Sequence, residues 1–268
     1  MYIDCNGNRT FYSTGSCQHR SDAAAVVFIH GAGLDHTVWV MPARHFARHG
    51  YNVVAPDLPG HGRSAGAALD SIDVIADWIC ELMDTMGLPT ATIVGHSMGS
   101  LVALNLAARR PEHASQLALL GTSTPMPVAD PLLNAARDNS HTAIDMANNW
   151  SYSRFATIGS NEVPGMWMTS GGERLLERAG EDVFFTDLNA CNNFDNGANL
   201  ATQVQCPSLV IIGAQDMMTA PVNSRKVAAA IPGCRTVELD RCGHSSLSER
   251  PDAVLNALRG LIVDGPAG

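Results

Sequence analysis

The chain has 268 residues, 46% hydrophobic and 16% charged, which allows one to two domains and excludes a disordered chain or a coiled coil. Its 17 basic and 26 acidic residues leave a net charge of −9 without a basic stripe, which argues against a nucleic-acid partner. The longest apolar run, residues 23–29, is too short for a membrane span, and seven cysteines without a C-x-x-C pair favour free thiols.

The first residues predict an antiparallel hairpin. Asn6-Gly7 lies between two short strand-like runs, and this dipeptide suits the positive φ values of a two-residue hairpin turn. The same stretch lacks the basic and then apolar layout of a secretory signal. We therefore expect a cytoplasmic protein.

The rest of the chain mostly alternates short apolar runs with longer, helix-like segments. The runs predict strands buried on both faces, at residues 25–29, 52–55, 91–94, 116–120, 208–212 and 236–239. The segments predict helices at residues 38–49, 71–86, 98–110, 222–230 and 251–262. This alternation predicts an α/β fold, a mostly parallel sheet of about eight strands with helices on both faces.

Residues 122–204 break the alternation. This segment is rich in Asn and contains helix-like patches at 131–137, 142–150, 173–179 and 182–191, without a convincing buried strand. We interpret it as a helical cap inserted after the sixth strand. The predicted organisation is a discontinuous core, residues 1–121 and 205–268, with residues 122–204 as the cap.

The strongest local motif is Gly95-His96-Ser97-Met98-Gly99, which follows a predicted strand and opens a predicted helix. That context is typical of a G-x-S-x-G nucleophile elbow. A side chain at either glycine would collide with backbone in so sharp a turn, so Ser97 is expected at the N-terminus of the helix. The amide of Met98 and the positive end of the helix dipole then face an oxyanion formed beside Ser97.

A serine nucleophile needs a base and an orienting acid, and both have candidates. Asp216 follows the strand at 208–212 and His244 follows the strand at 236–239, so both lie at carboxyl ends of predicted strands. Taken alone, an Asp in a loop is typical of a turn residue, and a single His is more typical of a structural residue. Together, in the order Ser97, Asp216, His244, they predict a catalytic triad.

A second oxyanion donor is expected in the loop after the first long strand. That loop reads His30-Gly31-Ala32-Gly33, and its small residues allow backbone amides to approach a substrate carbonyl. We favour the amide of Ala32, with Gly33 as the alternative donor or a contact to substrate. A plain tight turn is the other interpretation.

These motifs resemble the α/β-hydrolase fold family over nearly the whole chain. The matching segments are HGAG at 30–33, DLPGHGRS at 57–64, GHSMG at 95–99, the loop around Asp216, and Gly243-His244. The resemblance implies that residues 57–64 shape a turn, which makes His61 and Arg63 structural. It also implies that the cap lies over the nucleophile and supplies the acyl or alcohol pocket.

Several other residues are candidates for the site. Trp150, Trp167, Met166 and Met168 are candidates for lining the substrate pocket, with apolar packing as the alternative. Arg137, Arg154, Arg174 and Arg178 are candidates for holding an acidic substrate group, with exposed helical positions as the alternative. His45 and His49 lie four apart but lack a third ligand, so no metal site is predicted. Cys242 is expected to be a packed thiol.

The combination predicts a serine hydrolase without a cofactor, a carboxylesterase that cleaves small to medium acyl esters through an acyl-enzyme on Ser97. A hydrolase of carbon–carbon bonds in ring-cleavage products is an alternative, although such enzymes resemble G-N-S-M-G-G at the elbow and carry Trp after the catalytic His. Here the elbow reads GHSMGS and Ser245 follows His244. Thioesterase and lactonase activity stay open, as does a non-catalytic ligand receptor on the same fold.

Overall fold

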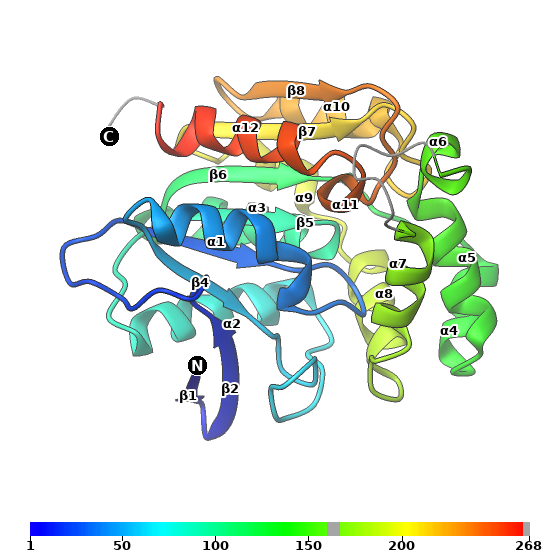
Figure 1. Ribbon diagram of the computed structural model, residues 1–268, viewed down its shortest axis with the longest axis horizontal. Coiled ribbons are helices and arrows are strands. Elements are labelled where there is room, and N and C mark those ends of the chain that lie inside the picture. The colour runs from blue at the N-terminus through cyan, green and yellow to red at the C-terminus, as the bar shows by residue number, and fades with distance from the viewer. Residues whose placement is uncertain (160–166, 265–268) are drawn as a thin grey trace.

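The computed structural model describes residues 1–159 and 167–264. Eight strands form one sheet in the order β1-β2-β4-β3-β5-β6-β7-β8 (Figure 1). The strands are β1 (Tyr2–Cys5), β2 (Asn8–Ser13), β3 (Ala25–Ile29), β4 (Asn52–Pro56), β5 (Ala91–His96), β6 (Ala114–Leu120), β7 (Ser208–Gly213) and β8 (Arg235–Leu239). All pairs are parallel except β1 with β2 and β2 with β4. The predicted α/β fold and its N-terminal hairpin are confirmed, with positive φ at Asn6 and Gly7.

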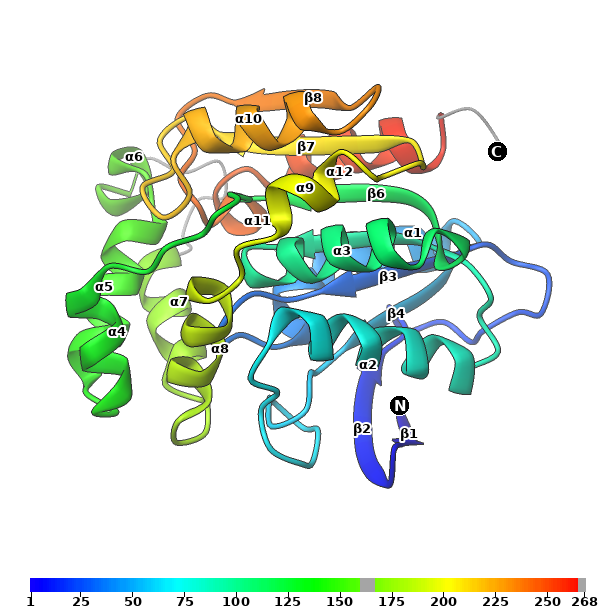
Figure 2. The same cartoon turned by 180° about the vertical axis from the view of Figure 1, so that it is seen from behind.

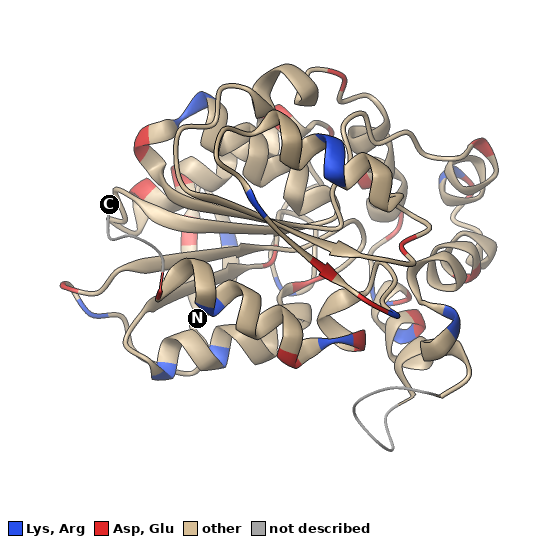
Figure 3. Cartoon of the chain, turned by 90° about the horizontal axis from the view of Figure 1, so that it is seen from above, with Lys and Arg blue, Asp and Glu red and all other residues tan. Residues whose placement is uncertain are grey.

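Helices cover both faces of the sheet, which the view from above in Figure 3 also shows. Figures 1 and 2 show α1 (Val40–Arg48) and α12 (Pro251–Ile262) on one face, and α2 (Ile72–Thr85), α3 (Met98–Arg109) and α10 (Pro221–Ala230) on the other. The short η1 (His36–Trp39), η2 (Pro111–His113) and α11 (Ser246–Glu249) complete the core. None of the helices in the described ranges is long and apolar enough to cross a membrane.

The apolar runs form strands because alternate side chains enter two cores. In β3, Val27 and Ile29 join the core under α2 and α3, whereas Val26 and Phe28 join the core under α1 and α12. The prediction of a strand buried on both faces is wrong for β8. This strand lies at the edge of the sheet, and Glu238 is exposed.

Between β6 and β7 the described chain forms α4 (Asp130–Arg137), α5 (His141–Ser151), α6 (Arg154–Thr157), α7 (Met168–Leu176), α8 (Val183–Asn192) and α9 (Gly197–Ala201). Helices α4 to α8 lie beyond the carboxyl ends of the parallel strands, as Figure 1 shows. Helix α9 instead packs on α3, and its Leu200 and Ala201 belong to the main core. The helical insertion after the sixth strand is confirmed, while the division at residues 121/122 and 204/205 stays a prediction.

Candidate active site

Ser97 occupies a strained turn between β5 and α3. Its φ of 55° and ψ of −122° lie where residues with a side chain are rarely found. A Cβ at Gly95 would lie 2.0 Å from the carbonyl oxygen of Gly99, and a Cβ at Gly99 would lie 2.2 Å from that of Ile29. The turn therefore needs both glycines, which agrees with the collision expected from the motif.

Asp216 and His244 form a buried pair at the carboxyl ends of β7 and β8. Asp216 Oδ2 lies 2.8 Å from His244 Nδ1 and also accepts the Thr219 hydroxyl at 2.7 Å. Asp216 Oδ1 accepts the amides of Met218 and Thr219 at 2.9 and 2.8 Å. Burial raises the pKa of Asp216, but His244 and these hydrogen bonds outweigh burial and hold it below its usual value. Because Nδ1 donates to a carboxylate, Nε2 of His244 is left to accept a proton.

Two neighbours help to place His244, one by leaving space for its ring and one by bonding to its backbone. Gly121 has a φ of 56°, and a Cβ there would lie 2.8 Å from His244 Cε1, so glycine makes room for the ring. His96 Nε2 donates to the backbone oxygen of His244 at 3.0 Å, with the two rings 4.9 Å apart. Burial and the nearby His244 lower the pKa of His96 to about 3, so His96 stays neutral. The motif contained His96, but nothing in its sequence position pointed to this support.

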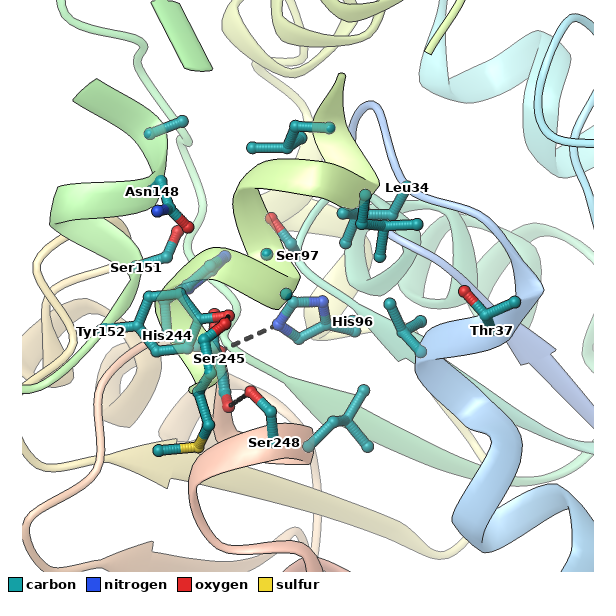
Figure 4. A pocket seen from close by; sticks show the side chains of 18 of the residues that line it. Leu34, Thr37, His96, Ser97, Asn148, Ser151, Tyr152, His244, Ser245 and Ser248 are labelled. Atoms are coloured by element: carbon teal, nitrogen blue, oxygen red, sulfur yellow. Dashed lines mark hydrogen bonds between the residues drawn. The ribbon is translucent and has the colours of Figure 1, made fainter. Parts of the chain in front are cut away.

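Ser97 and His244 both line a cavity of about 440 Å³ between the sheet and the cap (Figure 4). Within the described chain no hydrogen bond joins Ser97 Oγ to the imidazole. Such contacts are often long before substrate binds. Among the described lining residues none is Asp, Glu, Lys or Arg. The cavity is therefore suited to an uncharged ligand.

The cap contributes part of the predicted pocket lining. Trp167 and Met168 line the cavity, and Met166 lies outside the described residues. Trp150 is not among the described lining residues, because it packs against the apolar cluster that joins α4, α5 and α8. This placement favours the alternative of apolar packing over a substrate contact.

The loop after β3 brings one predicted oxyanion donor to the cavity. Ala32 lines the cavity, and the Met98 amide begins α3, where the first helical amides lack partners within the helix. Gly33 is absent from the described lining, and its amide donates to Asp187 Oδ2 at 2.8 Å. The Gly33 amide is therefore engaged elsewhere, which favours Ala32 over Gly33 as the oxyanion donor.

Asp187, on α8 of the cap, is a buried residue that the sequence analysis missed. Its Oδ2 accepts the Gly33 amide and also lies 2.8 Å from His61 Nε2, while His61 Nδ1 contacts the carbonyl oxygen of Pro59 at 3.0 Å. Burial lowers the pKa of His61, but the Asp187 carboxylate outweighs burial and holds it above its usual value. The pair joins the cap to the loop that carries Ala32. A separation of 126 residues from His61 left no local signal for Asp187.

The segment at 57–64 has structural contacts, in agreement with its interpretation. Asp57 accepts the backbone amides of His36 and Arg63 and the His36 imidazole at 2.7 to 2.9 Å. Burial raises the pKa of Asp57, but these bonds outweigh it and hold that pKa below its usual value. The Arg63 guanidinium lies 4.8 Å from the centre of the Phe11 ring.

The remaining candidates have no place in the cavity. The arginines Arg137, Arg154, Arg174 and Arg178 are exposed and absent from its described lining, which favours the alternative of exposed helical positions. Arg174 pairs with Glu173 and Glu177 of the cap, and Arg178 pairs with Asp35. His45 and His49 stack on each other, and the described chain brings them no third ligand. Cys242 is fully buried, as expected of a packed thiol.

Known proteins resemble this chain over most of its length. A family profile described as Alpha/beta hydrolase family matches residues 26–257. The RutD protein of Pseudomonas savastanoi pv. phaseolicola, named for carbamate hydrolysis, is 30% identical over 247 residues, 88% of this chain and 92% of its own. The 2-hydroxy-6-oxo-6-phenylhexa-2,4-dienoate hydrolase of Burkholderia cepacia is 27% identical over 253 residues, 88% of this chain and 87% of its own. Among solved structures, a thermophilic esterase is 26% identical with a TM-score of 0.80, covering 100% of this chain and 98% of that one.

Proposed function

The chain belongs to the alpha/beta hydrolase family, and from this premise we propose that it hydrolyses carboxylic esters of small to medium, uncharged acyl groups. One observation carries the proposal. Ser97 and the His244 ring, whose Nδ1 is held by Asp216, open into the same uncharged cavity of about 440 Å³. That volume lies within the usual range for small-molecule sites.

In the first half of the reaction Ser97 Oγ attacks the ester carbonyl, and His244 Nε2 takes its proton. Asp216 keeps the proton on Nδ1 and stabilises the imidazolium. The carbonyl oxygen becomes an oxyanion, which the amides of Ala32 and Met98 bind. Collapse of the intermediate breaks the bond to the leaving oxygen, and His244 Nε2–H protonates the departing alcohol.

In the second half a water molecule attacks the acyl-enzyme. His244 Nε2 takes a proton from the water as its oxygen bonds to the acyl carbon. The same amides hold the second oxyanion. Collapse releases the carboxylic acid and returns the proton to Ser97 Oγ, so the enzyme is regenerated and no outside reactant besides water is needed.

The lining favours an ester over the carbon–carbon alternative. The Burkholderia cepacia relative is named for a dienoate, which is a carboxylate, whereas the described cavity offers no Lys or Arg to pair with one. The residue after His244 is Ser245, without the Trp of that group. Thioester and lactone cleavage would use the same residues, and a receptor would need the cavity alone.

The test is a panel of p-nitrophenyl esters of increasing chain length, beside a ring-cleavage product, an acyl thioester and a lactone. We expect the highest kcat/KM on an uncharged ester of short or medium chain. Ser97→Ala should reduce kcat by about 10⁶-fold while its thermal unfolding stays cooperative. Unchanged turnover in Ser97→Ala, or faster cleavage of the ring-cleavage product than of any ester, would contradict the proposal.

A further inference from the structure

The two sides of the cavity differ in chemistry. Figure 4 shows Asn148, Ser151, Tyr152, Ser245 and Ser248 together on the His244 side of Ser97, and Leu34 on the opposite side. We call these five residues the hydroxyl wall. Leu176 and Phe184 also line the cavity, and both lie within 3.5 Å of the Cβ position at Gly33, beside the oxyanion loop. Thr37 also lines the cavity on the Leu34 side, but its hydroxyl already donates to Asp35 Oδ1. The side facing the hydroxyl wall is therefore mainly apolar.

The hydroxyl wall comes from two segments that are fixed to each other. The Ser245 amide donates to the Ser151 carbonyl oxygen at 2.9 Å, which joins the loop after His244 to the end of α5. The buried carboxylate of Glu249 accepts the Gly243 amide at 3.0 Å and the Ser153 amide at 3.1 Å. Because three hydrogen bonds hold these backbones together, the wall is preorganised for a ligand.

The Ser248 hydroxyl donates to the Ser245 carbonyl oxygen at 3.0 Å, so part of the wall's hydrogen-bonding capacity is used within the protein and the rest remains for a ligand. Tyr152 donates its hydroxyl to the Met168 carbonyl oxygen at 3.0 Å, and Asn148 Nδ2 donates to that of Thr169 at 3.0 Å, which leaves Asn148 Oδ1 as an acceptor. In the part of the chain that is described, the Ser151 hydroxyl has no hydrogen-bond partner. These groups offer both donors and acceptors without a net charge. They match the hydroxyl groups of a neutral ligand.

The reaction chemistry decides which part of an ester meets this wall. His244 Nε2–H protonates the leaving oxygen, so the leaving alcohol must lie on the His244 side of Ser97. Ser245 follows His244 directly, and the backbone of Ser151 accepts a hydrogen bond from the Ser245 amide. We propose that the hydroxyl wall is a subsite for the leaving alcohol, and that it selects a short neutral polyol, of the glyceryl type, over an alkyl alcohol. This inference rests on the proposed ester hydrolysis.

The test holds the acyl group constant and changes the alcohol. Initial rates on 2,3-dihydroxypropyl butyrate and propyl butyrate are measured in a pH-stat. The enzymatic rate on each ester is divided by the rate at which hydroxide hydrolyses that ester, which corrects for intrinsic reactivity. We expect kcat/KM to be about 10-fold higher for the dihydroxypropyl ester, the effect of one or two net hydrogen bonds. Ser151→Ala should lower this ratio at least about 3-fold.

A matched variant on the opposite wall is Leu34→Ala. It should keep the preference for the dihydroxypropyl alcohol while its best acyl chain becomes longer. If propyl butyrate is cleaved as fast as the dihydroxypropyl ester, and p-nitrophenyl butyrate is still cleaved, the subsite is wrong and ester hydrolysis stands. If Ser151→Ala slows both butyrates equally, the subsite is also wrong. If no ester is cleaved, p-nitrophenyl butyrate included, the proposed function itself fails.

Discussion

Two buried carboxylate–imidazole pairs, Asp216–His244 and Asp187–His61, have the same separation of 2.8 Å. Each also has a second, neutral histidine 4.9 Å from its ring. Burial lowers the pKa of His96 to about 3 and that of His30 to about 4, and the adjacent imidazole is the second cause of each decrease. Distance, burial and residue type therefore do not distinguish the pairs.

The pairs differ in what the second ring nitrogen contacts. In His61, Nδ1 meets the Pro59 carbonyl oxygen and Nε2 meets Asp187, so neither nitrogen can take a proton from a substrate. Among the described residues, hydrogen bonds to the His244 ring involve Nδ1 alone, and the ring lines the cavity beside Ser97. A carboxylate–histidine pair becomes a candidate base only where one nitrogen is left open toward a ligand.

The carboxylates differ as well. Both oxygens of Asp216 accept hydrogen bonds, which holds the pair in one orientation. Asp187 accepts its two donors, Gly33 and His61, on one oxygen, and its other oxygen has no partner in the described chain. The first arrangement orients a base. The second ties the cap to the oxyanion loop.

Asp216→Asn should give the largest effect of the variants that compare the pairs. An amide at this position cannot hold the Nδ1 proton as a carboxylate does, so kcat on p-nitrophenyl butyrate should fall about 10⁴-fold with little change in KM. Steady-state kinetics measure this. A loss below 10-fold would mean that the Asp216–His244 pair is no more catalytic than the other pair.

Gly121→Ala tests the same pair without changing a charge. The added Cβ would meet His244 Cε1 at 2.8 Å and displace the ring, so kcat should fall about 100-fold. The matched control is Gly87→Ala, where φ is also positive at 68° but no other group lies within 4 Å of the new Cβ. It carries the same backbone strain and should keep kcat. Equal losses in both variants would assign the effect to backbone strain alone.

Asp187→Asn should have a smaller effect on catalysis and a large one on stability. One oxygen accepts both the Gly33 amide and His61, and an amide offers either an oxygen or a nitrogen at that point, so one contact is lost. The free energy of unfolding should fall by about 3 kcal/mol. The loosened loop should lower kcat about 10-fold, without a comparable rise in KM.

Leu132→Ala is the control for that variant. Leu132 is buried in the cap cluster and is absent from the described lining of the cavity. It should lose a similar free energy of unfolding, measured with urea, yet keep kcat. If both variants reduce kcat equally, Asp187 acts through general cap stability and not through the oxyanion loop.

The pH dependence of stability gives the smallest effect. Because the pKa of His61 is raised in the folded protein, its contribution is fully present below about 6.5 and is lost as the pH rises through the higher folded value. The difference in free energy of unfolding between the wild type and His61→Gln should therefore shrink from pH 6 to pH 9. Urea titrations at both pH values measure it, and a constant difference would mean that His61 does not titrate in this range.

The sequence predicted the sheet and the elbow because their signals are local. Continuous apolar runs located the buried strands, and the glycines flanking Ser97 have a steric cause within five residues. The edge strand β8 was misjudged because its exposure depends on its place in the sheet order. The helices α6, α9 and α11 were missed because four or five residues do not show a helical period.

Side-chain partners across the fold were beyond the sequence. Asp216 and His244 were found because their motifs place them at strand ends, whereas Asp187 meets Gly33 and His61 only after the cap folds over the core. The sequence also could not decide between packing and substrate contact for Trp150, because its position on α5 does not reveal which side faces the cavity. Pairing between distant segments is decided by packing, which no local pattern records.

The assignment of Ser97 and His244 to catalysis is tested most directly by the rate at which a fluorophosphonate labels the protein, followed by intact mass and peptide mapping. We expect one adduct, on Ser97, and none in Ser97→Ala. Labelling should slow far more in Asp216→Asn than in Asp187→Asn. An adduct that persists in Ser97→Ala, or equal slowing in the two asparagine variants, would contradict the assignment of Ser97 and the Asp216–His244 pair to catalysis.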